Sequence, residues 1–154
     1  MRKAVRAIII RDNHLLVMHR HKFGKEYYNL VGGGIDFGET AEEALYREIK
    51  EETGVVFQNP RLVFVQEAGD PYGTQYIYLC DYVSGEPSLN PASEEALIHA
   101  GGQNLYTPMW LPLEKLPDVP FVMENLKQAI LDSISKGFPE RPLALESGEA
   151  DTVQ

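Results

Sequence analysis

The apolar residues in the first third of the chain come in short runs separated by turn residues. Residues 4–11 and 14–19 are rich in Ile, Leu and Val, and the Asp-Asn pair at 12–13 can adopt the positive φ angles of a tight turn. This pattern predicts a β-hairpin. Another strand is predicted over residues 26–31, and the glycines at 32–34 that end it mark a constrained backbone path.

From Thr40 onward the apolar spacing becomes that of a helix. Thr40 and Glu43 form a T-x-x-E capping box, and no proline interrupts residues 41–53. Gly54 stands where a left-handed residue closes a helix. The sequence therefore predicts a helix that begins at Thr40 and ends just before Gly54.

The middle of the chain returns to strand patterns. Residues 61–68 and 74–83 are rich in β-branched and aromatic side chains, and the Gly- and Pro-containing segment 69–73 between them is typical of a turn. A second hairpin is expected. Residues 90–102 form a looser acidic segment, followed by a short apolar piece at 105–111.

The last third predicts one helix and a tail. Residues 121–136 carry apolar side chains at helical spacing up to Gly137, so this helix should cover one face of the sheet. Beyond it the chain is acidic and rich in proline, and it has few large apolar groups after Leu145. We therefore expect one folded domain over residues 1–138 and a disordered tail over residues 139–154.

Charge and composition narrow the classes of function. The net charge of −9 leaves no basic patch for duplex nucleic acid or anionic lipid, so a polyanionic ligand would need a bridging cation. The single cysteine, Cys80, cannot form an internal disulfide, and no apolar stretch is long enough to span a membrane. A cytoplasmic protein without membrane partners is expected.

The predicted helix carries three glutamates on one face. Glu48, Glu51 and Glu52 are spaced i, i+3 and i+4, and like charges at this spacing destabilise an isolated helix. A hard cation, Mg²⁺ or its substitute Mn²⁺, would compensate these charges, because it prefers oxygen ligands such as carboxylates. The alternative is a solvated acidic face that pairs with Arg47 and Lys50.

The spacing around these glutamates resembles the Nudix box. All nine constrained positions match: Gly33, Glu39, Arg47-Glu48-Ile49, Glu51-Glu52 and Gly54-Val55. The strand with its glycine cluster at 29–35, and the segment from Trp110 to Glu114 before a C-terminal helix, are also similar to Nudix proteins. The resemblance implies an α/β Nudix fold, with a central mixed β-sheet sandwiched between α-helices.

The resemblance also implies an activity and its residues. The expected reaction is Mg²⁺-dependent hydrolysis of a diphosphate bond in a nucleoside diphosphate derivative or nucleoside triphosphate, which releases a nucleoside monophosphate. The implied metal ligands are Glu48, Glu51, Glu52 and the backbone carbonyl of Gly32. Glu39 would assist them, Arg47 would hold a catalytic glutamate in place, and the general base would be a box glutamate or Glu94 or Glu95.

Substrate contacts are expected from glycines and from the segment before the box. Gly33 and Gly34 would let the backbone approach the ligand. Arg20 or Lys22 would contact a phosphate while Tyr27 or Tyr28 stacks on a base, and the alternatives are a solvated loop and half-buried strand aromatics.

Two further readings come from other classes of function. The chain could be a nucleotide sensor or binding module with little turnover, although the complete glutamate set speaks against this. An isomerase that uses Cys80 is disfavoured, because no base neighbours this cysteine in the sequence. Dimers are common among similar proteins, so a homodimer is one expected assembly.

Overall fold

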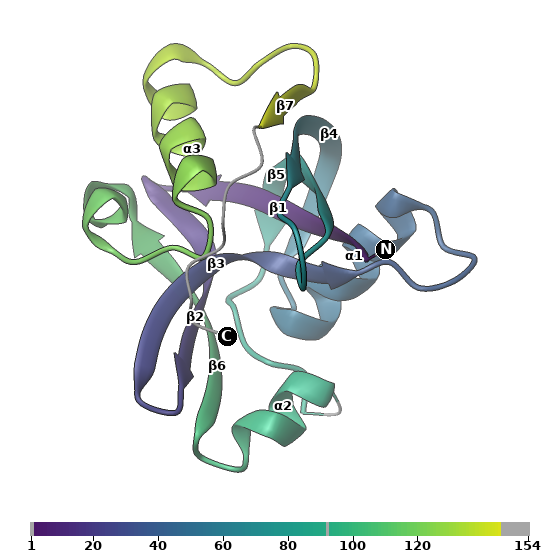
Figure 1. The fold of residues 1–154 in the computed structure, drawn as a ribbon, viewed down its shortest axis with the longest axis vertical. Helices are drawn as coiled ribbons and strands as arrows, with labels where there is room; N and C mark the ends of the chain where they lie inside the picture. Colours follow the sequence, from purple (N-terminus) through teal and green to yellow (C-terminus); the bar gives the residue numbers. More distant parts are fainter. Residues whose placement is uncertain (1, 92, 146–154) are drawn as a thin grey trace.

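A mixed seven-stranded sheet forms the centre of the computed structural model, which describes residues 2–91 and 93–145 (Figure 1). The strand order is β6-β2-β3-β1-β5-β4-β7. β1 pairs in parallel with β5, and β4 pairs in parallel with β7, whereas the other neighbours are antiparallel. The strands are β1 (Lys3–Arg11), β2 (His14–Lys22), β3 (Lys25–Gly34), β4 (Val56–Glu67), β5 (Thr74–Ser84), β6 (Asn104–Pro112) and β7 (Leu143–Leu145).

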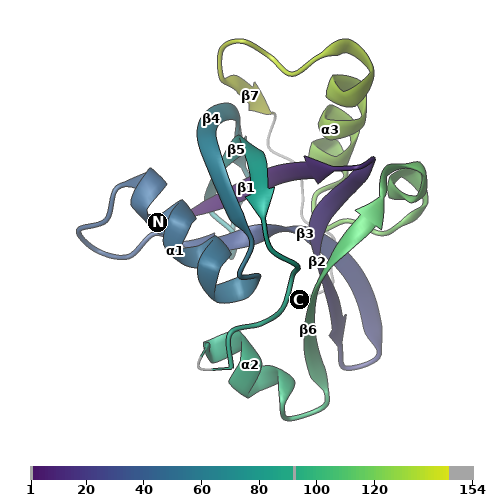
Figure 2. The same ribbon diagram turned by 180° about the vertical axis from the view of Figure 1, so that it is seen from behind.

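Helices cover both faces of this sheet. They are α1 (Ala41–Glu52), α2 (Glu94–His99) and α3 (Glu124–Lys136), with a 3-10 helix, η1 (Leu113–Asp118), before α3. Figure 1 and Figure 2 show α1 and α3 on either side of the central strands. The predicted α/β fold with its central sheet between helices is confirmed. Among the described residues, no helix is both long and apolar enough to cross a membrane.

Alternation along the central strands produces two cores. In β1, Val5, Ala7 and Ile9 pack with Leu45 and Ile49 of α1 on one face of the sheet. The opposite face carries a second cluster, in which Ile8, Leu15, Val17 and Leu30 pack with Leu126 and Ile130 of α3. Each fully buried Leu or Ile contributes about 1.5–3 kcal/mol of hydrophobic stabilisation.

Local signals place the first hairpin and α1. Asp12 and Asn13 have φ angles of 48° and 59°, as the two-residue turn between β1 and β2 requires. At the start of α1 the Thr40 hydroxyl accepts from the Glu43 N–H at 3.1 Å, and the Glu43 carboxylate accepts from the Thr40 N–H at 2.9 Å. Gly54 follows with φ of 72°. The predicted hairpin, capping box and left-handed glycine are all confirmed.

α3 begins later than the sequence pattern predicts. Residues 121 and 122 belong to the apolar stripe, but they run alongside β3 in an extended bridge. The Tyr28 N–H donates to the Pro120 carbonyl at 2.8 Å, and the Val122 N–H donates to the Tyr28 carbonyl at 3.0 Å. Pairing with a strand thus replaces the first helical turn.

The predicted disordered tail is wrong for its first residues. Residues 143–145 form β7, which adds a parallel strand to the outer edge of β4. Leu145 packs against the α3-side core, and Arg61 of β4 bonds to the Pro139 carbonyl. Main-chain pairing with an open edge therefore orders a segment whose composition suggests disorder. Residues 146–154 of the predicted tail lie outside the described residues.

The docking of β7 should contribute to the stability of the fold. A chain that ends at Phe138 should be less stable than the full chain by about 1–3 kcal/mol, because it loses the β4–β7 hydrogen bonds and the Leu145 contact. A chain that ends at Leu145 is the matched control, because it keeps β7 and its contacts. Urea unfolding of the three proteins measures the difference, and equal midpoints would contradict the docking.

Candidate functional site

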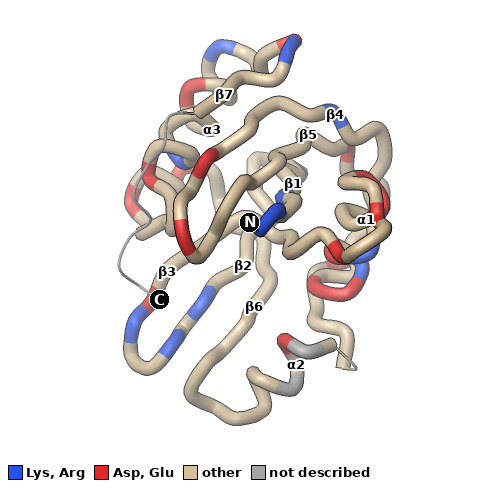
Figure 3. Tube along the Cα trace, turned by 45° about the vertical axis from the view of Figure 1, so that its right-hand side comes forward, with Lys and Arg blue, Asp and Glu red and all other residues tan. Residues whose placement is uncertain are grey.

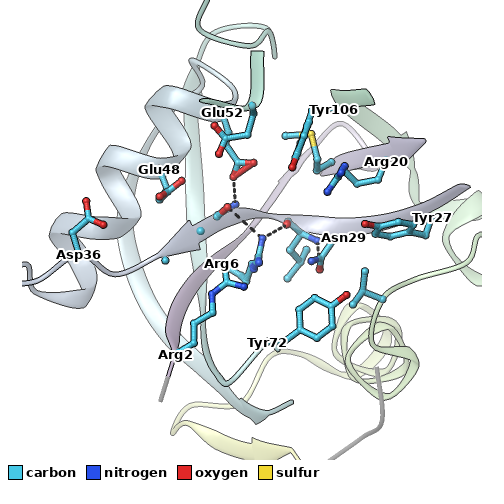
Figure 4. A pocket seen from close by; sticks show the side chains of 17 residues that line it. Arg2, Arg6, Arg20, Tyr27, Asn29, Asp36, Glu48, Glu52, Tyr72 and Tyr106 are labelled. Atoms are coloured by element: carbon cyan, nitrogen blue, oxygen red, sulfur yellow. Dashed lines mark hydrogen bonds between the residues drawn. The ribbon is translucent and has the colours of Figure 1, made fainter. Parts of the chain in front are cut away.

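A pocket of about 430 Å³ opens where β3 passes between α1 and the end of β1 (Figure 4). Carboxylates of α1 line one end of it, and arginines and tyrosines from several strands and loops line the other. The charged and aromatic lining residues are Arg2, Arg6, Arg20, Tyr27, Asp36, Glu48, Glu52, Tyr72, Glu95 and Tyr106, with Gly32, Gly33 and Gly34 on β3 between them.

The helix register aims two glutamates into this pocket. Glu48 and Glu52 are four residues apart on the inner face of α1, and they are 8% and 4% exposed. Glu52 accepts a hydrogen bond from the Gly32 N–H at 2.9 Å. A Cβ atom on Gly33 would collide with the Glu48 carboxylate, so the glycine lets β3 approach α1.

Burial makes these two carboxylates unusual. It raises the pKa of Glu52 to about 8, against the opposing effects of the Arg6 charge and the Gly32 N–H. It also raises the pKa of Glu48, although hydrogen bonding to Arg47 opposes that shift. Two neighbouring carboxylates that are costly to ionise fit a hard cation, which would stabilise both charges with oxygen ligands.

Glu51 does not share this environment. Its side chain is 41% exposed, and its carboxylate lies 3.5 Å from Arg47 instead of lining the pocket. Among the described residues, no three His, Cys, Asp or Glu side chains come together as a preformed metal cage. Of the three predicted ligands, Glu48 and Glu52 line the pocket, and Glu51 lies beside Arg47 outside it.

Arg47 organises the acidic end of the site. Its guanidinium binds Glu39 through two hydrogen bonds, at 2.6 and 2.8 Å, and donates to Glu48 at 2.9 Å. It also donates to the Gly34 carbonyl at 3.0 Å, which connects α1 to the end of β3. These are the contacts expected of a residue that holds a glutamate in place. Arg47 also lowers the pKa of Glu39 to about 2.

The opposite end of the pocket is cationic and aromatic. The Arg20 guanidinium lies over the Tyr106 ring at 3.6 Å from its centroid and 5.7 Å from that of Tyr27. The Leu105 carbonyl accepts from Arg20 at 3.2 Å, and the Asn104 side chain accepts a further bond. These contacts hold Arg20 at the pocket wall.

Two predicted substrate residues need correction. Lys22 is at the turn end of β2 and does not line the pocket. Tyr28 stacks on His19, with ring centroids 4.5 Å apart, and is not among the residues that line the pocket. Alternation in β3 explains the second error, because neighbouring strand residues point to different sides and Tyr27 takes the place facing the pocket.

The loop acid candidate lies at the pocket. Ser93 caps α2 by accepting from the Ala96 N–H at 3.1 Å, and Glu95 in its first turn lines the pocket. The side chain of Glu94 lies outside the described part of the chain. The segment 90–102 was expected to be loose, whereas residues 94–99 of it form this short helix.

Other pocket residues have no signal in the sequence. They lie far from the box in sequence: Arg2 just before β1, Arg6 in β1, Tyr72 in the β4–β5 loop and Tyr106 in β6. The only local hint is that Arg6 interrupts the apolar run of β1. Cys80, by contrast, is buried in β5 outside the pocket, and burial raises the pKa of its thiol. This placement disfavours a catalytic cysteine.

Charged residues also concentrate on either side of the pocket. Figure 3 shows acidic residues gathered on and around α1, and basic residues on the β2–β3 hairpin. The pocket lies between these two regions, so it offers carboxylates to a cation at one end and arginines to an anion at the other.

Comparison with known proteins identifies the family. The model of the NUDIX domain matches residues 1–131, so the chain belongs to the Nudix family of hydrolases. Members of this family generally use divalent metal ions. The complete box, the sheet between helices and the placement of the box helix against the pocket all agree with this assignment.

Relatives with assigned activities cover parts of the chain. The NAD-capped RNA hydrolase NudC of Photorhabdus laumondii is 34% identical over 127 residues, which cover 82% of this chain and 45% of that protein. An ADP-ribose pyrophosphatase of Methanocaldococcus jannaschii is 37% identical over 98 residues, 60% of this chain and 58% of the relative. The chain spans less than half the length of the NudC relatives it matches.

A solved structure shows the same fold. The crystal structure of an ADP-ribose pyrophosphatase from Streptococcus suis has a TM-score of 0.64 at 19% identity. The match covers 93% of this chain and 96% of that chain. The likeness confirms the predicted Nudix architecture.

The ion pair between Arg47 and Glu39 should make the stability of the protein depend on pH in the acid range. Since Arg47 lowers the pKa of Glu39 to about 2, from an ordinary 4.5, the charged carboxylate stabilises the fold above about pH 4.5, and this contribution is lost as pH falls toward 2. The stability advantage of the wild type over Glu39→Gln should therefore shrink across this window. Thermal unfolding between pH 2 and 7 measures it, with Glu42→Gln as control. An advantage that stays constant with pH would contradict the ion pair.

Proposed function

We propose that this chain is a Mg²⁺-dependent pyrophosphohydrolase that cuts the diphosphate bond of a nucleoside diphosphate derivative or nucleoside triphosphate and releases a nucleoside monophosphate. One observation carries the proposal: a single pocket combines the buried carboxylates Glu48 and Glu52 with a glycine-lined strand and an arginine- and tyrosine-lined wall. The carboxylates suit a cation, and the wall suits a phosphorylated, ring-containing ligand.

The residues at the acidic end of the pocket would each have a role in the proposed reaction. Glu48 and Glu52 would hold Mg²⁺, joined by Glu51 once its carboxylate leaves Arg47. Bound Mg²⁺ supplies neutralisation of the diphosphate oxygens and activation of the attacking water. Arg47 keeps Glu48 oriented through its bond at 2.9 Å. Glu95, at the pocket but on a different helix from the box, is the proposed proton acceptor.

The remaining residues would orient the substrate. Gly33 and Gly34 line the pocket, and no atom lies within 4 Å of the place a Cβ on Gly34 would take, so the backbone of β3 is open to a phosphate there. Arg20 would bind an anionic group with a guanidinium that Tyr106 and Asn104 already hold in place. Tyr27 and Tyr106 would pack against the nucleoside.

The names of the relatives suggest where the substrate search should begin. NAD-capped RNA and ADP-ribose are the substrates in those names, and both contain adenosine joined through a diphosphate. We propose a small diphosphate of this kind as the substrate, in a cytoplasmic setting.

A nucleotide sensor with little turnover is the second candidate. The observation that favours it is that Glu51 lies beside Arg47 and does not line the pocket. A sensor would bind nucleotides in the same pocket without consuming them.

Phosphate release after coupling to a phosphatase separates the two candidates. The panel should contain ADP-ribose, NAD, NADH, dinucleoside polyphosphates, nucleotide sugars and nucleoside triphosphates, each with Mg²⁺ and with EDTA. Turnover of a panel member that needs the metal supports the hydrolase. A folded protein that binds nucleotides without turnover supports the sensor.

Replacing Glu52 with Gln should abolish most of the activity. Loss of one charged ligand removes about 3 kcal/mol of transition-state stabilisation, which corresponds to about a 100-fold fall in kcat. Glu42→Gln is the matched control, since Glu42 is an exposed glutamate of the same helix outside the pocket, and its kcat should stay within about twofold. Wild-type kcat in Glu52→Gln would remove the proposed metal site.

The same variant should not be less stable in EDTA. Because burial raises the pKa of Glu52 from an ordinary 4.5 to about 8, its charge destabilises the metal-free fold increasingly as pH rises across this window. Gln keeps an oxygen for the Gly32 N–H and carries no charge. At pH 8 the Tm of Glu52→Gln should equal or exceed that of the wild type. A clear fall in Tm would assign Glu52 a structural role instead.

A further inference from the structure

Arg6 lies across β3 from the catalytic glutamates. In the β1–β3 ladder it is paired with Gly32, which has no side chain to block the space above the strand. A Cβ atom on Gly32 would collide with the Val5 carbonyl, so this close approach of the two strands requires glycine. The Arg6 side chain therefore reaches the pocket, and Figure 4 shows it on the opposite side of the β3 ribbon from Glu52.

Three hydrogen bonds fix the Arg6 guanidinium. Its Nε donates to the Gln75 side-chain oxygen at 3.0 Å, and its Nη1 donates to the Leu30 and Gly32 carbonyls at 3.2 and 3.3 Å. The amide nitrogen of Gln75 in turn donates to the Tyr72 carbonyl in the β4–β5 loop. Arg6 thus connects this loop to the glycine strand.

Gly32 is consequently held from both sides. Arg6 donates to its carbonyl at 3.3 Å, and Glu52 accepts from its N–H at 2.9 Å. The carbonyl is also an expected metal ligand, and its second lone pair is left for the cation. The N–H of Gly32 is the one hydrogen-bond donor that the described residues offer to the Glu52 carboxylate. The orientation of Glu52 therefore depends on that of the Gly32 backbone, which depends on Arg6.

The charge of Arg6 has no direct partner. Among the described residues no carboxylate lies within ion-pair distance of it, and the charge that favours its guanidinium most is that of Glu52 across the strand. A half-buried guanidinium without an ion pair is costly, and a neutral side chain would fill a purely structural position at less cost. Because Arg6 lies next to the pocket, we attribute the presence of this costly charge to the function of the site.

We propose that Arg6 is a positioning residue for the metal site: by locking the Gly32 backbone from β1, it sets the Glu52 carboxylate toward the cation. The inference rests on the proposed function and names a residue outside the box that the site needs. Gln75 has the same role one step further away, because it touches Arg6 and Tyr72 but does not line the pocket.

Two measurements on the whole protein test the proposal. The first is calorimetry of Mn²⁺ binding without substrate, and the second is steady-state kinetics. Outer residues that orient metal ligands typically change metal affinity or activity 10- to 100-fold, and we expect about that loss in both for Arg6→Met, with KM within about threefold. Arg6→Lys should recover part of the loss. Gln75→Met should show a smaller change in the same direction. Arg11→Met is the matched control, since Arg11 is on the same strand, binds Glu86 and lies outside the pocket.

The outcomes separate this inference from the proposed function. Unchanged Mn²⁺ affinity in folded Arg6→Met and Gln75→Met overturns the positioning role, as does a rise in KM alone, which would mean that Arg6 contacts the substrate. If Arg6→Met fails to fold, Gln75→Met decides. A wild type that turns over no substrate refutes the proposed hydrolase, while the Mn²⁺ comparison still decides the role of Arg6.

Discussion

The close approach of β3 to both of its neighbours governs the site. Gly32 fits against β1 because it has no side chain, and Gly33 fits against the Glu48 carboxylate for the same reason. This contact brings the Gly32 N–H to Glu52 at 2.9 Å and removes both glutamates from solvent. A side chain at Gly32 would collide with the backbone of β1, and one at Gly33 would displace the Glu48 carboxylate, so the shape of the pocket depends on both glycines.

Burial of acidic groups in a chain of net charge −9 needs nearby compensation, and two arginines provide it from different directions. Arg47 extends from α1 and binds Glu39, Glu48 and the Gly34 carbonyl. Arg6 acts from β1 through the Gly32 backbone. Neither arginine forms a hydrogen bond with Glu52 among the described residues, so this carboxylate retains the greatest cost of ionisation and the greatest gain from a divalent cation.

Local sequence predicted the parts of the site that lie close together in the chain. The capping box starts α1, and the four-residue spacing of Glu48 and Glu52 puts both on its inner face, so their placement follows from helical geometry alone. Glu51 was predicted on the same face, but its carboxylate lies 3.5 Å from Arg47 and does not line the pocket. Tyr28 shows the limit of strand patterns. The sequence shows that neighbouring side chains point to opposite sides of the strand, but it does not show which side faces the pocket.

By itself, the sequence determined the hairpins, the box helix, the acidic end of the pocket and the Nudix class, because each depends on contacts within a few residues or on a fixed local spacing. Only the tertiary structure decided three other features. These are the arginine and tyrosine wall of the pocket, the hydrogen bonds from Gln75 through Arg6 to Gly32, and the formation of strand β7. These features depend on pairings between distant segments, such as β1 with β5 and β4 with β7. Composition and periodicity carry no information on which strand edges meet, so residues such as Arg6 acquire their neighbours only when the sheet is assembled.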